Sequence, residues 1–360
     1  MVISRTPFRI SFLGGGTDYP AWYKEHGGAV LATTINKYCY LTCRYLPPFF
    51  DHRYRVMWSK IENCQTIDEI THPAVREILR FMDIDRGVEI HHDGDLPARS
   101  GTGSSSSFTI GLLNALYALQ GKMVGKKQLS AESIHIEQNV LRENVGSQDQ
   151  IMAAHGGFNK VTFDQSGQIN VVPMSLSQER MQELESHIML FYTGVKRTAS
   201  DVVQSYVHDI GKKRRQLRIM QDLVDEGFNL LNSQTNIEKF GELLHENWQI
   251  KKELGDKISN PHIDSIYDAA LSAGALGGKL SGAGGGGFMA LFVPPSRQKA
   301  VVENLNGLVR VPFKFESSGS QVIFFEPEED FEAIERLRAE QNIMPFRELE
   351  TMAKTREAGG

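Results

Sequence analysis

The chain has 360 residues, of which 41% are hydrophobic and 23% are charged. These proportions are typical of a folded globular protein and exclude a wholly disordered chain, a collagen and a polytopic membrane protein. The 44 acidic residues outnumber the 39 lysines and arginines, and the net charge of −5 supplies no general attraction to nucleic acid or anionic membranes. At roughly 150 residues per domain, the length suggests about two domains.

The cysteine content indicates a reducing compartment. Cys39, Cys43 and Cys64 are an odd and sparse set. Cys39 and Cys43 are spaced like two metal ligands, but no second pair of Cys or His residues completes a site, so we interpret all three as buried thiols in the cytosol. Arg5 and Arg9 interrupt the first apolar stretch, which argues against a signal peptide. We therefore expect a cytoplasmic protein.

Hydrophobic periodicity and turn residues predict alternating strands and helices. In chain order, the pattern predicts strands over 2–13, 29–35 and 38–45, a helix over 68–82, a strand over 88–91, helices over 108–119 and 129–141, and a hairpin of 158–163 with 169–172. After a composition shift near 175–187, it predicts a strand over 188–192, helices over 201–232, 237–254 and 261–273, a strand over 288–293, a helix over 297–308, a strand over 322–325 and a charged helical tail over 328–358. This order indicates a two-domain mixed α/β or α+β enzyme.

The sharpest motif is the Gly/Ser-rich segment Pro97–Ser107, which runs directly into an apolar helical pattern. Glycines let the backbone approach an anion closely, and a helix N-terminus directs free N–H groups at it. We interpret the segment as a triphosphate-binding loop, because a flexible linker does not usually lead straight into a buried helix. No Gly-x4-Gly-Lys-Ser/Thr sequence occurs in the chain, so the loop is not a Walker A motif.

A second glycine cluster satisfies the spacing Gly-x-Gly-x-x-Gly at Gly282, Gly284 and Gly287. A dinucleotide-binding fingerprint follows a strand and opens a helix. This cluster instead precedes the apolar strand pattern of 288–293. The order of elements therefore disfavours a nicotinamide or flavin site.

Three segments together resemble the GHMP small-molecule kinases, the family of galactokinase, homoserine kinase, mevalonate kinase and phosphomevalonate kinase. They are Arg5–Tyr19, Pro97–Ser107 and Lys279–Gly287, which occur in family order. The resemblance spans about residues 2–325 and implies an α+β fold of two domains, with ATP in the cleft between them. It implies an N-terminal ATP-binding domain like ribosomal protein S5 domain 2, a ferredoxin-like C-terminal domain, and the cofactors ATP and Mg²⁺. The expected domains are 1–180 and 181–327, followed by the tail 328–360.

The resemblance also suggests roles for individual residues. Asp149 matches the carboxylate that would take the proton of a sugar hydroxyl during phosphoryl transfer. Arg9 matches a basic residue whose charge would keep Asp149 ionised and stabilise the transferring phosphoryl group. Asp18 matches the residue that hydrogen-bonds sugar hydroxyls. The resemblance further implies that the loop 101–107 wraps the phosphates, through Gly101, Thr102, Gly103, Ser104, Ser105, Ser106 and Ser107, and that Gly282, Ala283, Gly284 and Gly285 support the second domain's side of the site.

The same resemblance points to a magnesium site. Glu137 lies 12 residues before Asp149, where the family has its Mg²⁺-binding glutamate. Ser104 or Ser105 would be its partner ligand, and Glu143 is the rival carboxylate. Hard oxygen ligands together with phosphate oxygens and waters suit Mg²⁺.

The expected acceptor follows from Gly15 and Gly16. Galactokinases carry Glu and His there, and in that resemblance these side chains contact the far end of the hexose. The two glycines remove both contacts and open space for a sugar extended beyond C6. With the segments 143–150 and 193–199, the pattern resembles the D-glycero-D-manno-heptose 7-phosphate kinases of this family. These enzymes phosphorylate the anomeric 1-hydroxyl and give the 1,7-bisphosphate for nucleotide-heptose and surface polysaccharide synthesis.

A sugar phosphate requires cations, and an arginine fork binds phosphate bidentately. Lys196 and Arg197 are the first candidates, because they follow the strand over 188–192 and a turn at Gly194. Further candidates are Lys37, Arg44, Arg53 and Arg55. The expected substrate-binding set is Asp18, Gly15, Gly16, Thr17, Lys196 and Arg197.

Three other functions remain open at this point. A GHMP kinase could act on fucose or another free sugar, in which case Arg197 would contribute little to substrate binding. A catalytically silent sugar sensor is disfavoured by the presence of Asp149, Arg9 and both glycine loops, and an NAD-dependent dehydrogenase by the order of elements. We expect a sugar phosphate and ATP as partners, and no nucleic acid or membrane partner. Whether the chain forms a homo-oligomer is open.

Overall fold

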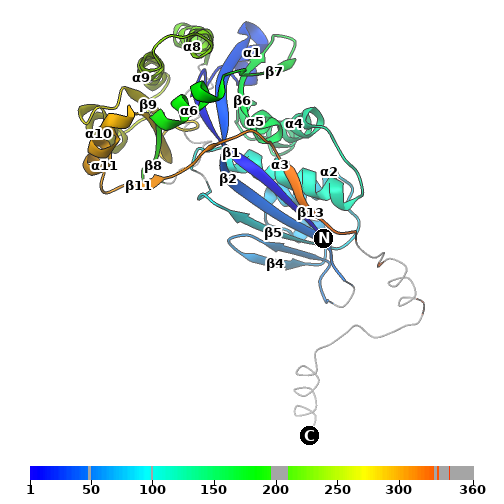
Figure 1. Cartoon of the computed structure of the whole chain (residues 1–360). Helices are drawn as coiled ribbons and strands as arrows, with labels where there is room; N and C mark the ends of the chain where they lie inside the picture. The colour runs from blue at the N-terminus through cyan, green and yellow to red at the C-terminus, as the bar shows by residue number, and fades with distance from the viewer. Residues whose placement is uncertain (48–49, 99, 196–209, 328–330, 332–339, 341–360) are drawn as a thin grey trace.

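The structure is a computed structural model of the chain (Figure 1). It describes residues 1–327 except 48–49, 99 and 196–209, together with residues 331 and 340. No helix in these ranges is both long enough and apolar enough to cross a bilayer.

Two sheets organise the described residues, and Figure 1 shows the elements of the second to the left of the first. The larger sheet has the order β13-β1-β2-β5-β3-β4, with β12 and β6 also paired to β2, and β7 paired to β6. Its strands are β1 (Val2–Leu13), β2 (Gly28–Tyr45), β3 (Tyr54–Met57), β4 (Ile61–Cys64), β5 (Val88–Gly94), β6 (Phe158–Phe163), β7 (Ile169–Pro173), β12 (Phe315–Glu316) and β13 (Gln321–Phe325).

The smaller sheet is antiparallel and has the order β11-β8-β10-β9. In chain order its strands are therefore arranged 4-1-3-2, with helices after the first and third strands, which is the ferredoxin-like arrangement. The predicted α+β fold is confirmed. The strands are β8 (Ile188–Tyr192), β9 (Gly277–Leu280), β10 (Phe288–Phe292) and β11 (Val309–Val311), and the helices are α8 (Arg214–Asn232), α9 (Glu238–Lys252), α10 (Pro261–Ser272) and α11 (Gln298–Asn304).

Helix α3 (Ser104–Leu119) packs on β1 and β2 and holds the Gly/Ser loop in place. Gly111 allows this close approach, because a Cβ atom there would lie 2.9 Å from Thr6 Oγ1. Ser4 Oγ donates a hydrogen bond of 2.8 Å to the Gly111 carbonyl. The helix begins after Gly103, whose left-handed φ of +77° turns the loop into the first helical turn.

A continuous hydrophobic core joins the two sheets. Phe12 of β1 makes edge-to-face contacts with Phe158 and with Phe240 of α9, in both cases with ring centroids 5.6 Å apart. Phe240 in turn packs against Phe292 of β10. Helix α8 also contacts β1 and β2, so the relative placement of the two sheets is fixed by buried apolar surface.

The end of the described chain returns to the first sheet. β13 pairs with β1, so that Val2 lies opposite Phe325, and β12 pairs with β2. Residues 315–325 therefore complete the first sheet, although they belong to the segment 181–327 predicted as the second domain. The predicted boundary at 180/181 stays a prediction.

The remaining helices show how proline and capping residues decide element boundaries. The helix predicted over 68–82 is a 3-10 turn at Ile67–Glu69 followed by α2 (Pro73–Phe81). Pro73 favours the first helical turn, and His72 Nδ1 accepts from Val75 N, so the helix starts there. The other elements are α1 (Pro20–His26), which the pattern did not predict, α4 (Lys126–His135), a π-helical turn (Ile136–Val140), α5 (Gln148–His155), α6 (Gln178–His187), and 3-10 turns at Ile210–Lys213 and Pro295–Arg297.

The predicted hairpin of 158–163 with 169–172 is confirmed by the pairing of β6 with β7. The predicted strands over 188–192, 288–293 and 322–325 are also confirmed. Residues 201–209 of one predicted helix, and the tail over 328–358 apart from residues 331 and 340, lie outside the described residues.

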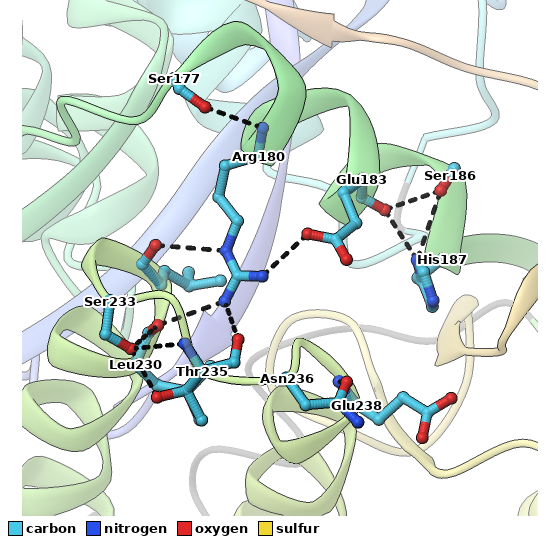
Figure 2. Close-up of polar contacts among 11 residues, drawn as sticks. Ser177, Arg180, Glu183, Ser186, His187, Leu230, Ser233, Thr235, Asn236 and Glu238 are labelled. Carbon is cyan, nitrogen blue, oxygen red and sulfur yellow. Dashed lines mark hydrogen bonds and ion pairs between the residues drawn. The ribbon is translucent and has the colours of Figure 1, made fainter.

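Arg180 of α6 joins this helix to the C-terminal end of α8 (Figure 2). Its guanidinium donates to the carbonyls of Leu230, Leu231 and Thr235 at 3.3, 3.4 and 2.8 Å, and to the Glu183 carboxylate at 2.8 Å. Carbonyls at a helix C-terminus lack partners within the helix, and a cation there also interacts favourably with the helix dipole. Arg180 therefore stabilises the connection between the two sheets.

We expect Arg180→Met to lower the free energy of unfolding by about 1–3 kcal/mol, because these carbonyls lose a charged donor. Urea unfolding measures the effect. Arg218→Met is the matched control, since Arg218 is exposed on α8. Equal stabilities of the two variants would contradict this role.

Candidate active site

The three glycine-containing motifs meet at one cavity of about 300 Å³, lined by residues from both sheets and their loops. Of the predicted site residues, those that line it are Arg9, Gly15, Gly16, Asp18, Gly101, Gly103, Ser104, Ser105, Ser106, Glu137, Glu143, Asp149, Gly282 and Ala283. The structure therefore brings together most of the residues predicted from three distant parts of the chain.

Several predicted residues lie behind this cavity or outside the described residues. Thr17 Oγ1 donates to the carbonyls of Gly14 and Ala29, so this side chain holds the loop before α1. Ser107 Oγ donates to the Pro7 carbonyl on β1. Thr102, Gly284 and Gly285 are also not among the lining residues, and Lys196 and Arg197 fall outside the described residues.

Arg9 and Asp149 form a two-pronged ion pair at the cavity. Arg9 Nε donates to Asp149 Oδ1 and Nη2 to Oδ2, both at 2.7 Å. Nη1 donates to the Gly101 carbonyl at 2.5 Å, and the Arg9 backbone N–H to the Thr102 carbonyl at 3.1 Å. The Arg9 side chain is 4% exposed, whereas that of Asp149 is 25% exposed and faces the cavity. The carboxylate is thus fixed in orientation beside the Gly/Ser loop.

The position of Asp149 at the start of α5 adds a second favourable interaction. It lies in the first turn of this helix, where the helix dipole stabilises a negative charge. Gly103 of the loop lies close by, since a Cβ atom there would be 3.4 Å from Asp149 Oδ2. A phosphate held by the loop would therefore lie next to this carboxylate.

Asp18 is buried under the cavity and connects the loop before α1 to the start of α5. Its Oδ1 accepts from Gly16 N at 2.9 Å and its Oδ2 from Gln148 Nε2 at 3.0 Å. Gly146 has to be a glycine, because a Cβ atom there would lie 1.9 Å from Asp18 Oδ2. Burial raises the pKa of Asp18, and the charge of Asp149 raises it further.

Glu137 lies in the π-helical turn and is fully buried at the edge of the cavity. Its carboxylate accepts from Ser106 Oγ at 2.9 Å, Gln150 Nε2 at 2.6 Å and Ser133 Oγ at 3.2 Å. Burial raises the pKa of Glu137 to about 7. π-helical turns are frequent at functional sites, because the wider turn redirects a side chain.

Within the Gly/Ser loop and the start of α3, Ser106 donates to Glu137, whereas the predicted partner was Ser104 or Ser105. Helix α3 already begins at Ser104, so its turn directs Ser106 inwards and leaves Ser105 exposed. Within the described ranges, no group of three or more His, Cys, Asp or Glu residues could hold a metal ion alone. One carboxylate and nearby hydroxyls suit Mg²⁺ only when phosphate oxygens and waters complete its coordination.

Four residues near this cavity received no role in the sequence analysis: Ser11, Gln148, Lys251 and Lys279. Lys251 lines the cavity and its Nζ donates to the Gly282 carbonyl at 2.5 Å. Lys279 is 1% exposed on β9. For Lys279, the sequence offered one signal, its position beside the second glycine cluster. That position does not indicate whether the side chain points to solvent or to the interior.

We expect Glu137 to make the stability of the ligand-free protein depend on pH. The folded state holds the Glu137 proton up to about pH 7, whereas the ordinary carboxyl pKa is 4.5. The free energy of unfolding should therefore fall as pH rises from 4.5 towards 7, by up to about 3 kcal/mol, and level off above that.

Urea unfolding of the wild type and Glu137→Gln between pH 5 and 8, without divalent metal, measures this contribution. The amide removes the titration and keeps an oxygen that accepts from Ser106, so the variant should lose less stability over this range. Identical pH dependence in the two proteins would contradict the raised pKa.

The Gly/Ser loop at a helix N-terminus suits phosphates, the Arg9–Asp149 pair lies beside it, and the buried Glu137 lies at the same cavity. These features together are typical of a small-molecule kinase. The chain belongs to the GHMP kinase family. The model of the GHMP kinases N terminal domain matches residues 69–157, and that of the GHMP kinases C terminal domain matches residues 229–310. The protein is therefore an ATP-dependent sugar kinase.

Individual relatives and solved structures support this assignment. The D-glycero-alpha-D-manno-heptose 7-phosphate kinase of Campylobacter jejuni is 28% identical over 84% of this chain and 92% of its own length. The crystal structure of a D-glycero-D-manno-heptose 1-phosphate kinase from Bacteriodes thetaiotaomicron is 26% identical, with a TM-score of 0.74 over 91% of this chain and all of that one. The L-fucokinase/L-fucose-1-P guanylyltransferase of Bacteroides fragilis is 25% identical over 80% of this chain, which spans 34% of that protein.

Proposed function

We propose that the protein transfers the γ-phosphate of ATP to the anomeric 1-hydroxyl of D-glycero-D-manno-heptose 7-phosphate, giving the 1,7-bisphosphate. The observation that carries the proposal is the missing side chain at Gly15, a position on the cavity where the surroundings would admit one. A Cβ atom there would have no neighbour closer than 3.6 Å. This space suits an acceptor longer than a hexose, and the names of two relatives specify heptose phosphates, although they differ in the position of the phosphate.

The Gly/Ser loop is the proposed binding site of the ATP phosphates. Its backbone N–H groups and hydroxyls lie at the N-terminus of α3, where anions are stabilised. Glu137 and the hydroxyls of Ser104 and Ser106 are the proposed holders of Mg²⁺, which would neutralise charge on the phosphate oxygens. The second glycine loop also lines the cavity, through Gly282 and Ala283.

Asp149 is the proposed proton acceptor, and Arg9 holds it in place. A 1-hydroxyl placed at the exposed edge of the Asp149 carboxylate would lose its proton there as the oxygen attacks the γ-phosphorus. The guanidinium of Arg9 keeps the carboxylate oriented and offers positive charge to the phosphoryl group in transit. Asp18 is proposed to bind sugar hydroxyls next to this position.

The three cysteines are buried and free, which supports the proposed cytoplasmic location. A sugar phosphate and ATP as partners agree with this compartment. The proposal includes no nucleic acid or membrane partner.

We expect Asp149→Asn to lower kcat by about 10²–10⁴-fold, because the amide cannot accept the proton. The dissociation constant of ATP, measured by calorimetry, should change little. Asp268→Asn on the exposed face of α10 is the matched control. Turnover of Asp149→Asn near the wild-type rate would exclude this residue as the base.

ADP release across a panel of sugars tests the acceptor. The panel contains D-glycero-D-manno-heptose 7-phosphate, mannose 6-phosphate, sedoheptulose 7-phosphate, galactose and fucose, and ³¹P NMR locates the new phosphate. We expect turnover with the heptose phosphate and a phosphate at the anomeric carbon. Turnover with fucose alone would instead favour a free-sugar 1-kinase, the second candidate, which the fucokinase relative supports.

A further inference from the structure

Lys279 is a buried cation without a matching anion. It lies on β9 with 1% of its surface exposed. Among the described residues, no carboxylate forms an ion pair with its ammonium group. A charged group is buried at a high cost unless it is paired, so this lysine needs a reason to be there.

The charges around Lys279 increase this cost. Burial lowers the pKa of its ammonium group well below the usual value, and the positive charges of Lys251 and Arg9 lower it further. Asp18 and Asp149 act in the opposite direction and offset only part of the effect. An anion bound beside the ammonium group would raise this pKa and stabilise the charged form of the lysine.

Three polar side chains converge on one point above Gly15. A Cβ atom on Gly15 would lie 3.6 Å from Lys279 Nζ, 3.6 Å from Ser11 Oγ and 3.7 Å from Gln148 Nε2. Ser11 Oγ is buried and has no hydrogen-bond partner among the described residues, so its hydroxyl can donate to a ligand, and Gln148 Nε2, which donates one hydrogen to Asp18, has a second hydrogen to offer. Ser11, Gly15 and Gln148 line the cavity, so a ligand in the cavity can approach Gly15 on the side that these three polar groups border.

The backbone at residue 15 does not explain why a glycine is present. Gly14 and Gly16 have left-handed φ values of +79° and +119°, but Gly15 does not. A side chain at residue 15 would be compatible with the backbone and would fill the space that the three polar groups surround. The glycine therefore keeps this space open for a ligand.

We propose that Lys279, with Ser11 and Gln148, forms an anion subsite that binds the phosphate group carried by the sugar acceptor. The inference rests on the proposed function, in which the acceptor is a sugar phosphate. None of the three atoms nearest to this point belongs to the Gly/Ser loop, which favours the phosphate of the acceptor over the phosphates of ATP. Lys279 then determines specificity for a phosphorylated sugar, and Lys251 adds a second positive charge nearby.

Lys279→Met tests the subsite, because methionine keeps most of the volume and removes the charge. We expect kcat/KM for D-glycero-D-manno-heptose 7-phosphate to fall at least ~30-fold, mainly through KM, since a buried charge partner is lost. For the same sugar without its phosphate, the kcat/KM of Lys279→Met should differ from that of the wild type by less than about 3-fold, and the KM for ATP should stay constant. Equal losses with both sugars, or a loss expressed in the KM for ATP, would overturn the proposal.

Gly15→Ala is a second variant in case Lys279→Met does not fold. The new methyl group would lie between the three polar groups without a steric clash, so it should hinder the approach of the phosphate, raise the KM for the phosphorylated sugar and leave thermal stability nearly unchanged. Gly307→Ala is the control, because a Cβ atom there has no neighbour within 4 Å. An unchanged KM in Gly15→Ala would argue against a ligand at this point.

The two proposals fail in different ways. If the wild type does not phosphorylate any sugar phosphate but does phosphorylate a free sugar, the proposed function is wrong and the subsite is rejected with it. If the wild type uses the heptose phosphate and Lys279→Met uses it equally well, only the subsite is rejected. Inorganic phosphate provides an independent probe, since it should inhibit the wild type in competition with the sugar and inhibit Lys279→Met much more weakly.

Discussion

The bidentate pair between Arg9 and Asp149 is the interaction on which the rest of the site depends. It joins the middle of β1 to the first turn of α5, and the third donor of Arg9 reaches the Gly101 carbonyl of the Gly/Ser loop. Three segments separated by up to 140 residues are held by one guanidinium. Its rigid planar fork makes this possible, and a lysine would not reproduce the geometry.

The fold and most of the cavity could be predicted, because their signals are local or belong to motifs in a fixed order. The apolar pattern identified the longer strands, and the Gly/Ser segment before an apolar run identified α3 and its loop. The short strands β3, β4, β9, β11 and β12 were missed, because two to four residues give too little pattern. Asp149, Arg9 and Asp18 came from the family resemblance and lie at one cavity. The boundaries were less accurate where a capping residue decides them, as at His72 and Pro73.

The parts that could not be predicted depend on which side chains the folded chain brings together. Ser106 donates to Glu137, although Ser104 or Ser105 was the predicted partner, because the turn of α3 directs the Ser106 hydroxyl inwards. Lys279 occupies an alternating position on a strand, where a lysine ordinarily faces solvent, and only the packing of β9 buries it. The hydrophobic periodicity of the sequence does not show which serine points inwards or whether a strand lysine is buried, since the residues that contact them lie far away in the sequence.

Because β13 pairs with β1, the first sheet is completed only late in the synthesis of the chain. Val2 finds its partner Phe325 only after almost the whole chain has left the ribosome, so the edge of the first sheet stays open during synthesis. Contacts of such large sequence separation form late, because the entropy of closing a long loop has to be overcome first. A ribosome that stalls before residue 315 therefore leaves a nascent chain with an exposed strand edge, which chaperones and proteases recognise.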